Sequence, residues 1–236
     1  MELLLRYRLL FFLFFLVLNF TSQEVGAKTE TQLTEIEVTE LLRKIEVQFL
    51  LTTTLATKFQ QEKQISFFEG KMISTGALLF KSPGKVRMDS FSPFKTSAIV
   101  NGNNAVLYEF MDETWKKLDN SENGMVQAVM KNIISWLQGK FNDSSLYGVA
   151  GVRKNGLTYL TLTPKSVAYQ KHIHHFELGI NKAVNGLDSI LIMLPDGDYT
   201  LYKFYNDRIN NDLSEEIFDT QKKEPSFLPL WLNPIP

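Results

Sequence analysis

The stretch GALLFKSPGKVRMD, residues 76–89, decides the fold. Two apolar runs meet at Ser82-Pro83-Gly84-Lys85, which could be either a phosphate-binding loop or a tight corner between strands. A phosphate loop needs the spacing G-x-x-x-x-G-K-[ST] with a helix after it. Apolar and polar residues instead alternate over residues 86–90, which is the period of a strand. The stretch therefore predicts a hairpin corner in a sheet.

Further strand-like segments extend outward from this corner. The expected strands cover residues 55–65, 76–81, 85–90, 96–100, 105–110, 114–118, 149–153, 157–163, 190–194 and 199–206. Asn101-Gly102, Asn155-Gly156 and Asp196-Gly197 favour hairpin turns of type I′, in which both central residues have positive φ. Three such hairpins indicate a meandering antiparallel sheet.

Two segments have the apolar spacing of amphipathic helices. In residues 33–49, Ile36, Leu41 and Ile45 recur at spacings of four or five with charged residues between them. Residues 121–139 carry a wide apolar stripe that begins after a residue suited to an N-cap and ends at a glycine. The second helix interrupts the strands, so we expect it to cover a face or the mouth of the sheet.

The N-terminal residues predict that the protein is exported. Arg6 and Arg8 precede an apolar run that is typical of a signal peptide, and Val25-Gly26-Ala27 offers the small side chains that cleavage requires. We expect a signal peptide over residues 1–27, one domain over residues 28–220, and a proline-rich apolar tail over residues 221–236. An uncleaved membrane anchor is the alternative, although the run is short for a bilayer span.

The composition narrows the classes of partner. The chain has no cysteine, which excludes disulfides, thiolate metal sites and a lipid-modified N-terminal cysteine. Its net charge is −1 with both signs interspersed, so it lacks the basic patch that nucleic-acid binding requires. We therefore expect a monomer that binds its partners through apolar surface.

The order of these segments resembles the LolA family of periplasmic lipoprotein carriers. After the N-terminal helix, the resemblance is carried by TKFQQEK (57–63), residues 76–89, IVNGNNAVLYE (99–109), NGLTYLTLTPK (155–165) and PDGDYTLYKF (195–204). It implies an α+β fold, a strongly curved, incomplete antiparallel β-barrel covered by helices, whose apolar interior holds acyl chains. Family members accept cargo from an inner-membrane ABC transporter and hand it to an outer-membrane acceptor.

The expected cavity lining follows from strand parity and from the inner stripe of the 121–139 helix. It comprises Phe59, Leu78, Phe80, Val86, Met88, Ile99, Tyr108, Met130, Ile133, Leu137 and Leu162. An error of one residue in parity would exchange a whole strand face. A dry hydrophobic core made by the same residues is the alternative interpretation.

Five residues are candidates for closing the mouth of this cavity: Lys81, Ser82, Pro83, Met125 and Trp231. The resemblance implies an arginine directly before the corner proline, and this chain has Ser82 there. A hydroxyl offers one hydrogen bond worth about 1 kcal/mol. We therefore expect the apolar tail to lie across the opening, with a disordered tail as the alternative.

Catalysis and metal binding have little support. The chain lacks G-x-S-x-G, H-E-x-x-H and a cysteine nucleophile, so we expect neither an enzyme nor a cofactor. His172 and His174 could share a strand face and bind zinc, but with His175 they are read as surface histidines. Two other functions stay open, a carrier of a glycolipid or isoprenoid-linked lipid, and a lipoprotein-sensing regulator, which would need a second domain.

Overall fold

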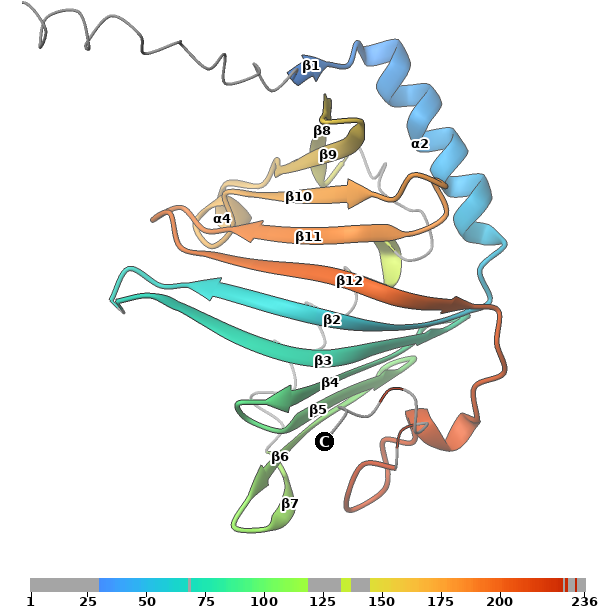
Figure 1. The fold of residues 1–236 in the computed structure, drawn as a ribbon, viewed down its shortest axis with the longest axis vertical. Coiled ribbons are helices and arrows are strands. Elements are labelled where there is room, and N and C mark those ends of the chain that lie inside the picture. The colour runs from blue at the N-terminus through green and yellow to red at the C-terminus, as the bar shows by residue number, and fades with distance from the viewer. Residues whose placement is uncertain are drawn as a thin grey trace, which may run out of the picture.

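The computed structural model describes residues 30–67, 69–118, 133–136, 145–226, 228 and 232. Within these residues the strands form a single 12-stranded antiparallel sheet in the order β1-β8-β9-β10-β11-β12-β2-β3-β4-β5-β6-β7 (Figure 1). The sheet is strongly curved and stays open, which confirms the expected incomplete barrel.

The strands fall into two meanders joined by one long-range pairing. The first contains β2 (Thr54–Gln64), β3 (Lys71–Lys81), β4 (Lys85–Ser92), β5 (Thr96–Asn101), β6 (Asn104–Met111) and β7 (Thr114–Lys117). The second contains β8 (Tyr147–Lys154), β9 (Leu157–Pro164), β10 (His175–Ile180), β11 (Leu187–Met193) and β12 (Tyr199–Ile209), with β1 (Glu30–Gln32) added to β8. Pairing of β12 with β2 makes the two meanders one sheet.

The corner at Ser82-Pro83-Gly84 is a hairpin, as the alternation around it predicts. Lys81 pairs with Lys85 across it, and Gly84 takes a φ of +71° that other residues adopt reluctantly. The turn type needs correction at two of the three expected type I′ hairpins. Only Asn155-Gly156 has positive φ at both positions, whereas the loops at Asn101-Gly102 and Asp196-Gly197 have it at the glycine alone.

Helix α2 (Glu35–Leu50) matches the first expected helix. It begins with a capping box, in which the Thr34 backbone N–H donates to the Glu37 carboxylate (2.8 Å) and the Glu37 N–H donates to the Thr34 hydroxyl (3.3 Å). Its buried residues are Val38, Leu42, Ile45 and Phe49. Ile36 was expected on the buried stripe, but it is 74% exposed.

The second expected helix lies mostly outside the described residues. Residues 133–136 are helical, and Met125, Met130 and Leu137 are not among the residues that the structure describes. The sequence patterns did not predict β1, β10, the short helix α4 (Val167–Gln170) or the 3₁₀ helix η1 (Glu215–Phe218). In the described part of the chain, no helix combines the length and the apolar character needed to cross a membrane.

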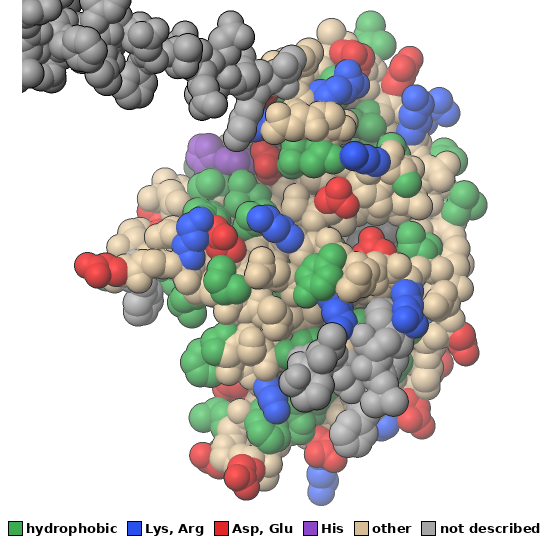
Figure 2. All heavy atoms as spheres, in the orientation of Figure 1, with side chains coloured by type: hydrophobic (Ala, Val, Ile, Leu, Met, Phe, Trp, Pro, Cys, Tyr) green, Lys and Arg blue, Asp and Glu red, His purple; other side chains and the backbone are tan. Residues whose placement is uncertain are grey.

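Successive residues of a strand point to opposite sides of the sheet, which gives the sheet two faces. Other parts of the chain cover both faces. Over the helix face, α2 packs on β8 to β11 and residues 133–136 also contact the sheet. Over the tail face, the C-terminal residues from Leu213 onward pack on β2 to β6. Charged side chains of both signs are scattered over the surface view in Figure 2, as the composition predicts.

Candidate functional site

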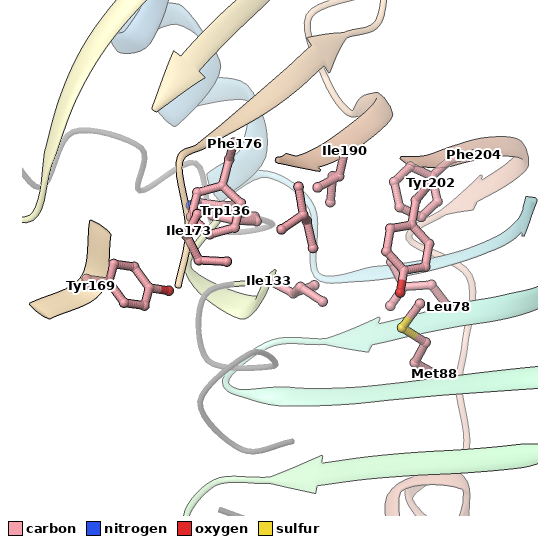
Figure 3. A pocket seen from close by; sticks show the side chains of 11 residues that line it. Leu78, Met88, Ile133, Trp136, Tyr169, Ile173, Phe176, Ile190, Tyr202 and Phe204 are labelled. Atoms are coloured by element: carbon pink, nitrogen blue, oxygen red, sulfur yellow. The ribbon is translucent and has the colours of Figure 1, made fainter. Parts of the chain in front are cut away.

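An apolar cavity of about 140 Å³ lies on the helix face, where two hydrophobic clusters meet (Figure 3). One cluster belongs to α2 and β8 to β11, and the other to β2 to β5. The lining side chains are Leu78, Met88, Ile133, Trp136, Tyr169, Ile173, Phe176, Ile190, Ile192, Tyr202 and Phe204. The cavity therefore lies at the junction of the two meanders, which we call the seam.

Strand β12 supplies the floor of this seam. Its alternate residues Tyr202 and Phe204 face the cavity with stacked rings, 6.5 Å apart and inclined by 8°. Phe59 of the neighbouring strand β2 meets the Tyr202 ring edge-on at 5.5 Å. The aromatic floor thus depends on the long-range pairing of β12 with β2.

The helical residues 133–136 bridge the two clusters. Ile133 belongs to the β2–β5 cluster, whereas Trp136 belongs to the α2 cluster. The Trp136 ring contacts Phe176 of β10 edge-on at 4.9 Å. This one helical turn therefore spans the seam and forms one wall of the cavity.

Among the described lining residues, none carries a formal charge. Two tyrosines, Tyr169 and Tyr202, belong to the lining, and the Tyr202 hydroxyl accepts a hydrogen bond of 2.7 Å from the Gln61 side-chain amide. Burial raises the pKa of Tyr202 to about 12, so the phenol is neutral at physiological pH. The lining residues that the structure describes therefore offer mainly apolar contact, with no carboxylate, imidazole, amine or thiol among them.

The structure gathers most of the described predicted lining residues on the helix face. Leu78, Met88 and Ile133 line the cavity itself. Four more pack in the adjoining clusters of the same face: Phe59, Phe80, Val86 and Leu162. The expected lining residues of β2, β3, β4 and β9 therefore lie on the face of the sheet that holds this cavity.

Ile99 and Tyr108 lie on the tail face, which corrects the expected parity of β5 and β6. Ile99 pairs with Arg87, whereas Val100 pairs with Val86. Neighbouring strand residues point to opposite faces, so the expected alternation is one residue out on these two strands. Both side chains pack against the C-terminal segment instead.

Eight lining residues were missed by the sequence reading. They are Trp136, Tyr169, Ile173, Phe176, Ile190, Ile192, Tyr202 and Phe204. The alternation of Tyr202 and Phe204 in an expected strand was a usable signal. The connection between β9 and β10, which carries Tyr169 and Ile173, has no such pattern.

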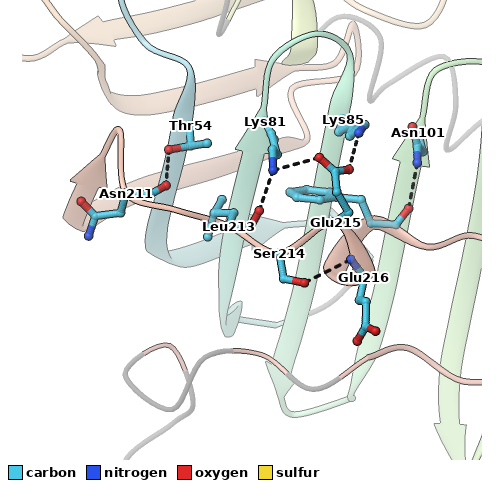
Figure 4. Close-up of polar contacts among 10 residues, drawn as sticks. Thr54, Lys81, Lys85, Asn101, Asn211, Leu213, Ser214, Glu215 and Glu216 are labelled. Carbon is cyan, nitrogen blue, oxygen red and sulfur yellow. Dashed lines mark hydrogen bonds and ion pairs between the residues drawn. The ribbon is translucent and has the colours of Figure 1, made fainter.

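The hairpin corner binds the C-terminal segment rather than the cavity (Figure 4). The Lys81 ammonium donates to the Leu213 carbonyl at 2.6 Å and lies 2.9 Å from the Glu215 carboxylate, which Lys85 also contacts. Ser82 and Pro83 are exposed, and neither lines the cavity. The corner is thus an anchor on the tail face.

The described part of the tail docks on the sheet, but not over the cavity. Leu228 and Leu232 are buried against the tail face, on the side opposite the cavity. This corrects the expected plug, because these leucines cannot cover a mouth on the other face. Trp231 lies outside the described residues.

A buried ion pair supports the docked segment. The Arg87 guanidinium donates two hydrogen bonds to the Asp89 carboxylate (2.7 and 2.9 Å) and a third to the Ile217 carbonyl (3.2 Å). The Ser97 hydroxyl donates to Asp89 at 2.6 Å. A second, more open cavity of about 350 Å³ lies beside this pair, between β4 and residues 224–228.

The histidines do not share a strand face as expected. His172 lies in the turn after α4, and β10 begins only at His175. The Nδ1 atoms of His174 and His175 are 2.7 Å apart, and burial together with the charge of His174 lowers the pKa of His175. Among the described residues, no three His, Cys, Asp or Glu side chains come together as a metal site.

Comparisons with solved structures find low identity and partial superposition. A LolA superfamily protein from Nitrosomonas europaea is 11% identical, with 77% of this chain and 97% of that chain covered and a TM-score of 0.40. Mycobacterium tuberculosis lipoprotein LppX is 10% identical, with 77% and 99% covered and a TM-score of 0.45. Pseudomonas aeruginosa MucB, solved in complex with MucA, is 14% identical, with 80% and 63% covered and a TM-score of 0.44.

Sequence comparison gives the family. A search of curated protein sequences found no match. The family described as "Outer membrane lipoprotein carrier protein LolA", in contrast, matches residues 51–221, which include all the strands from β2 to β12. The chain therefore belongs to the LolA family.

Proposed function

We propose that this protein is a periplasmic carrier that shields the acyl chains of lipoproteins and shuttles them from the inner membrane to the outer membrane. The observation that carries the proposal is the uncharged apolar cavity at the seam of the sheet. An inner-membrane ABC transporter would supply the cargo, and an outer-membrane acceptor would receive it. Export through residues 1–27 is part of the same proposal.

The size of the cavity implies that loading widens it. An apolar cavity of about 150 Å³ in another protein holds one benzene molecule, and the cavity here measures about 140 Å³. It accommodates a segment of an acyl chain, not a whole chain. Cargo would therefore separate residues 133–136 from the seam and use both clusters as its walls.

The energetics suit a reversible carrier. Each methylene buried from water contributes about 0.8 kcal/mol, so an acyl chain of about sixteen carbons is worth on the order of 10 kcal/mol when fully shielded. Part of this is offset by separating residues that already contact each other, such as Trp136 and Phe176. The net affinity is then low enough for cargo to be handed on.

A pair of tryptophan substitutions tests this proposal. Ile192→Trp places a larger side chain in the cavity from β11, so a fluorescent fatty-acid probe loses part of its apolar contact with the cavity wall. The probe should therefore bind roughly tenfold more weakly. Met88→Trp from the opposite wall should act in the same way. Leu51→Trp is the matched control, because Leu51 is 64% exposed and lies away from the lining.

Probe binding that is equal in all four proteins would overturn the proposal. Thermal unfolding shows whether each variant is folded, since overpacking costs about 1–3 kcal/mol. Mass spectrometry of lipid that co-purifies with the wild type identifies the cargo. An acylated peptide supports the lipoprotein carrier, whereas a glycolipid or an isoprenoid-linked lipid favours a carrier of that lipid.

A further inference from the structure

The two ends of the sheet differ in the side chains that they expose. In an antiparallel sheet, alternate connections lie at the same end. The pairings of Gln64 with Lys71, of Gln64 with Tyr199 and of Met193 with His175 place the β2–β3 and β11–β12 connections and the start of β10 at one end. We call this the tip end; it also holds the β4–β5 and β6–β7 connections and lies on the left in Figure 1.

Large apolar side chains are exposed on four connections of the tip end. Phe67 in the β2–β3 turn is 96% exposed, Phe94 between β4 and β5 is 70% exposed, and Val167 at the start of α4 is 71% exposed. Met111, next to the β6–β7 turn, is 47% exposed. Figure 2 shows hydrophobic side chains along the same side of the molecule.

The strand connections at the opposite end have a different chemistry. Ser82-Pro83-Gly84, Gly102-Asn103 and Asn155-Gly156 are compact turns of small or polar residues. Large exposed apolar residues do occur near that end, at Leu50 and Leu51 where α2 finishes. Single exposed apolar residues are common, but their recurrence on successive connections of one end indicates an apolar contact surface.

The β2–β3 turn projects farther than its neighbour. Strand β3 begins at Lys71, yet its pairing with β4 begins only at Thr75. Met72 and Ile73 in this overhang are 41% and 45% exposed, on opposite faces of the strand. The overhang therefore presents apolar side chains on both faces and Phe67 at its end.

The cavity reaches the tip end through the connection between β9 and β10. Tyr169 of α4 and Ile173, which lies just before β10, both line it (Figure 3). Val167 is exposed on the same short helix. An apolar partner at the tip end would thus adjoin one wall of the cavity.

Charges at the tip end are balanced. Lys71 pairs with Glu62 at 2.7 Å, and Lys116 pairs with Asp112 at 2.6 Å. The Lys95 ammonium lies 5.1 Å from the centre of the Phe110 ring, which attracts a cation through its π electrons. This surface therefore lacks the excess of basic residues that binds anionic lipid, and its chemistry fits a neutral lipid surface.

We propose that the tip end inserts Phe67 and Phe94 into the boundary between the headgroups and acyl chains of a lipid bilayer. Cargo then passes between the bilayer and the cavity without crossing water. This inference rests on the proposed carrier function and adds a direct membrane contact to it.

Vesicle flotation with the protein in the form that cells export tests the contact. Phosphatidylcholine vesicles are the probe. The double variant Phe67→Ser, Phe94→Ser should partition at least roughly tenfold more weakly, because each lost aromatic side chain removes buried apolar area. The matched control Leu50→Ser, Leu51→Ser removes apolar residues near the opposite end and should partition as the wild type does.

Salt and probe measurements separate this inference from the carrier proposal. Partition should be the same at about 0.05 M and about 0.5 M salt, because screening weakens only charge attraction. The Phe67, Phe94 variant should still bind the fatty-acid probe in solution but deliver it to vesicles more slowly. Ile192→Trp should show the reverse, with weak probe binding and normal partition.

Absence of wild-type partition would overturn the membrane contact, as would an equal loss in the Leu50, Leu51 control. Partition that disappears at high salt would also overturn it, because the contact would then be electrostatic. Normal partition with no probe binding in any protein would overturn the carrier proposal and leave the membrane contact standing.

Discussion

The tail face and the helix face are both apolar, but they are closed in different ways. On the tail face, side chains of the sheet donate hydrogen bonds to carbonyls of the C-terminal segment. Lys81 donates to Leu213, Arg87 to Ile217, Asn101 to Phe218, Lys117 to Thr220 and Tyr108 to Lys222. On the helix face, the described cavity wall of residues 133–136 meets the sheet through Ile133 and Trp136.

This difference between hydrogen-bonded and apolar closure indicates which face can open. Hydrogen bonds are directional and fix the register of a docked segment, whereas apolar contact is non-directional and tolerates displacement. Phe218 on the tail face is fully buried, whereas Phe204 on the helix face borders an open cavity. The tail face is therefore the fixed one, and under the proposed function cargo would enter through the helix face.

The largest expected effect comes from breaking the polar support of the tail face. Arg87→Leu leaves the Asp89 carboxylate buried without its charged partner, which should lower the free energy of unfolding by about 3–5 kcal/mol. Urea denaturation measures this change. Lys116→Ala breaks an exposed ion pair with Asp112 and is the control, expected to change stability little. An equally small change for Arg87→Leu would contradict the assignment of the tail face as the fixed one.

A matched pair of phenylalanines sharpens the comparison. Phe218→Ala creates a cavity in a packed region and should cost about 3–4 kcal/mol of unfolding free energy. Phe204→Ala enlarges an existing cavity and should cost about 1–2 kcal/mol, because its ring is only partly buried. Binding of the fatty-acid probe should change only in Phe204→Ala. If Phe218→Ala alone altered probe binding, the assignment of roles to the two faces would be reversed.

Removing the end of the tail should have a smaller effect on stability. Truncation after Lys223 deletes Leu228 and Leu232, whose burial stabilises the fold by about 1.5–3 kcal/mol each. The cost of ordering the segment offsets part of this, so we expect a net loss of about 2 kcal/mol. The dissociation rate of a bound probe should stay unchanged, since the deleted leucines contact the tail face. Faster dissociation would show that the tail acts on the cavity after all.

Local patterns in the sequence were sufficient for most of the sheet. The alternation of apolar and polar residues around the Ser82-Pro83-Gly84 corner predicts that β3 pairs with β4, and it predicts which side chains of the two strands share a face. The spacing of apolar residues predicts helix α2, although Ile36 lies on the exposed side of this helix. These elements are local, so a window of about ten residues contains their signal.

The cavity could be predicted only in part, because it lies at a long-range seam. Its floor depends on the pairing of β12 with β2, whose partners Tyr202 and Gln61 are far apart in the chain. Neither strand carries a local signal for that pairing. On β5 the apolar run Ala98-Ile99-Val100 is covered on both faces, so alternation could not show which residue points to the cavity.

The smallest expected effect concerns the clamp of Lys81 and Lys85 on Glu215. Hydrogen bonds from Lys85 and Lys81 lower the pKa of Glu215 below its ordinary value of 4.5. The ionised carboxylate is favoured in the folded state, so its contribution to stability is present above the unfolded pKa and is lost as pH falls through the folded one. Glu215→Gln should therefore be less stable than the wild type at neutral pH. The difference should shrink once pH falls below about 4.5.

The urea midpoints of the wild type and of Glu215→Gln, measured from neutral to acid pH, test this contribution as the difference between the two proteins. The carboxyls of Glu37, Glu62 and Asp112 also have lowered pKa values, and they are common to both proteins, so their contributions cancel. Glu62→Gln serves as the matched control, because Glu62 is likewise paired with a lysine but lies in β2 near the tip end. Limited proteolysis of the C-terminal segment should respond to acid in the wild type and in Glu62→Gln, and less in Glu215→Gln. If all three respond alike, Glu215 does not hold the segment, and Arg87 with the packed apolar residues holds it alone.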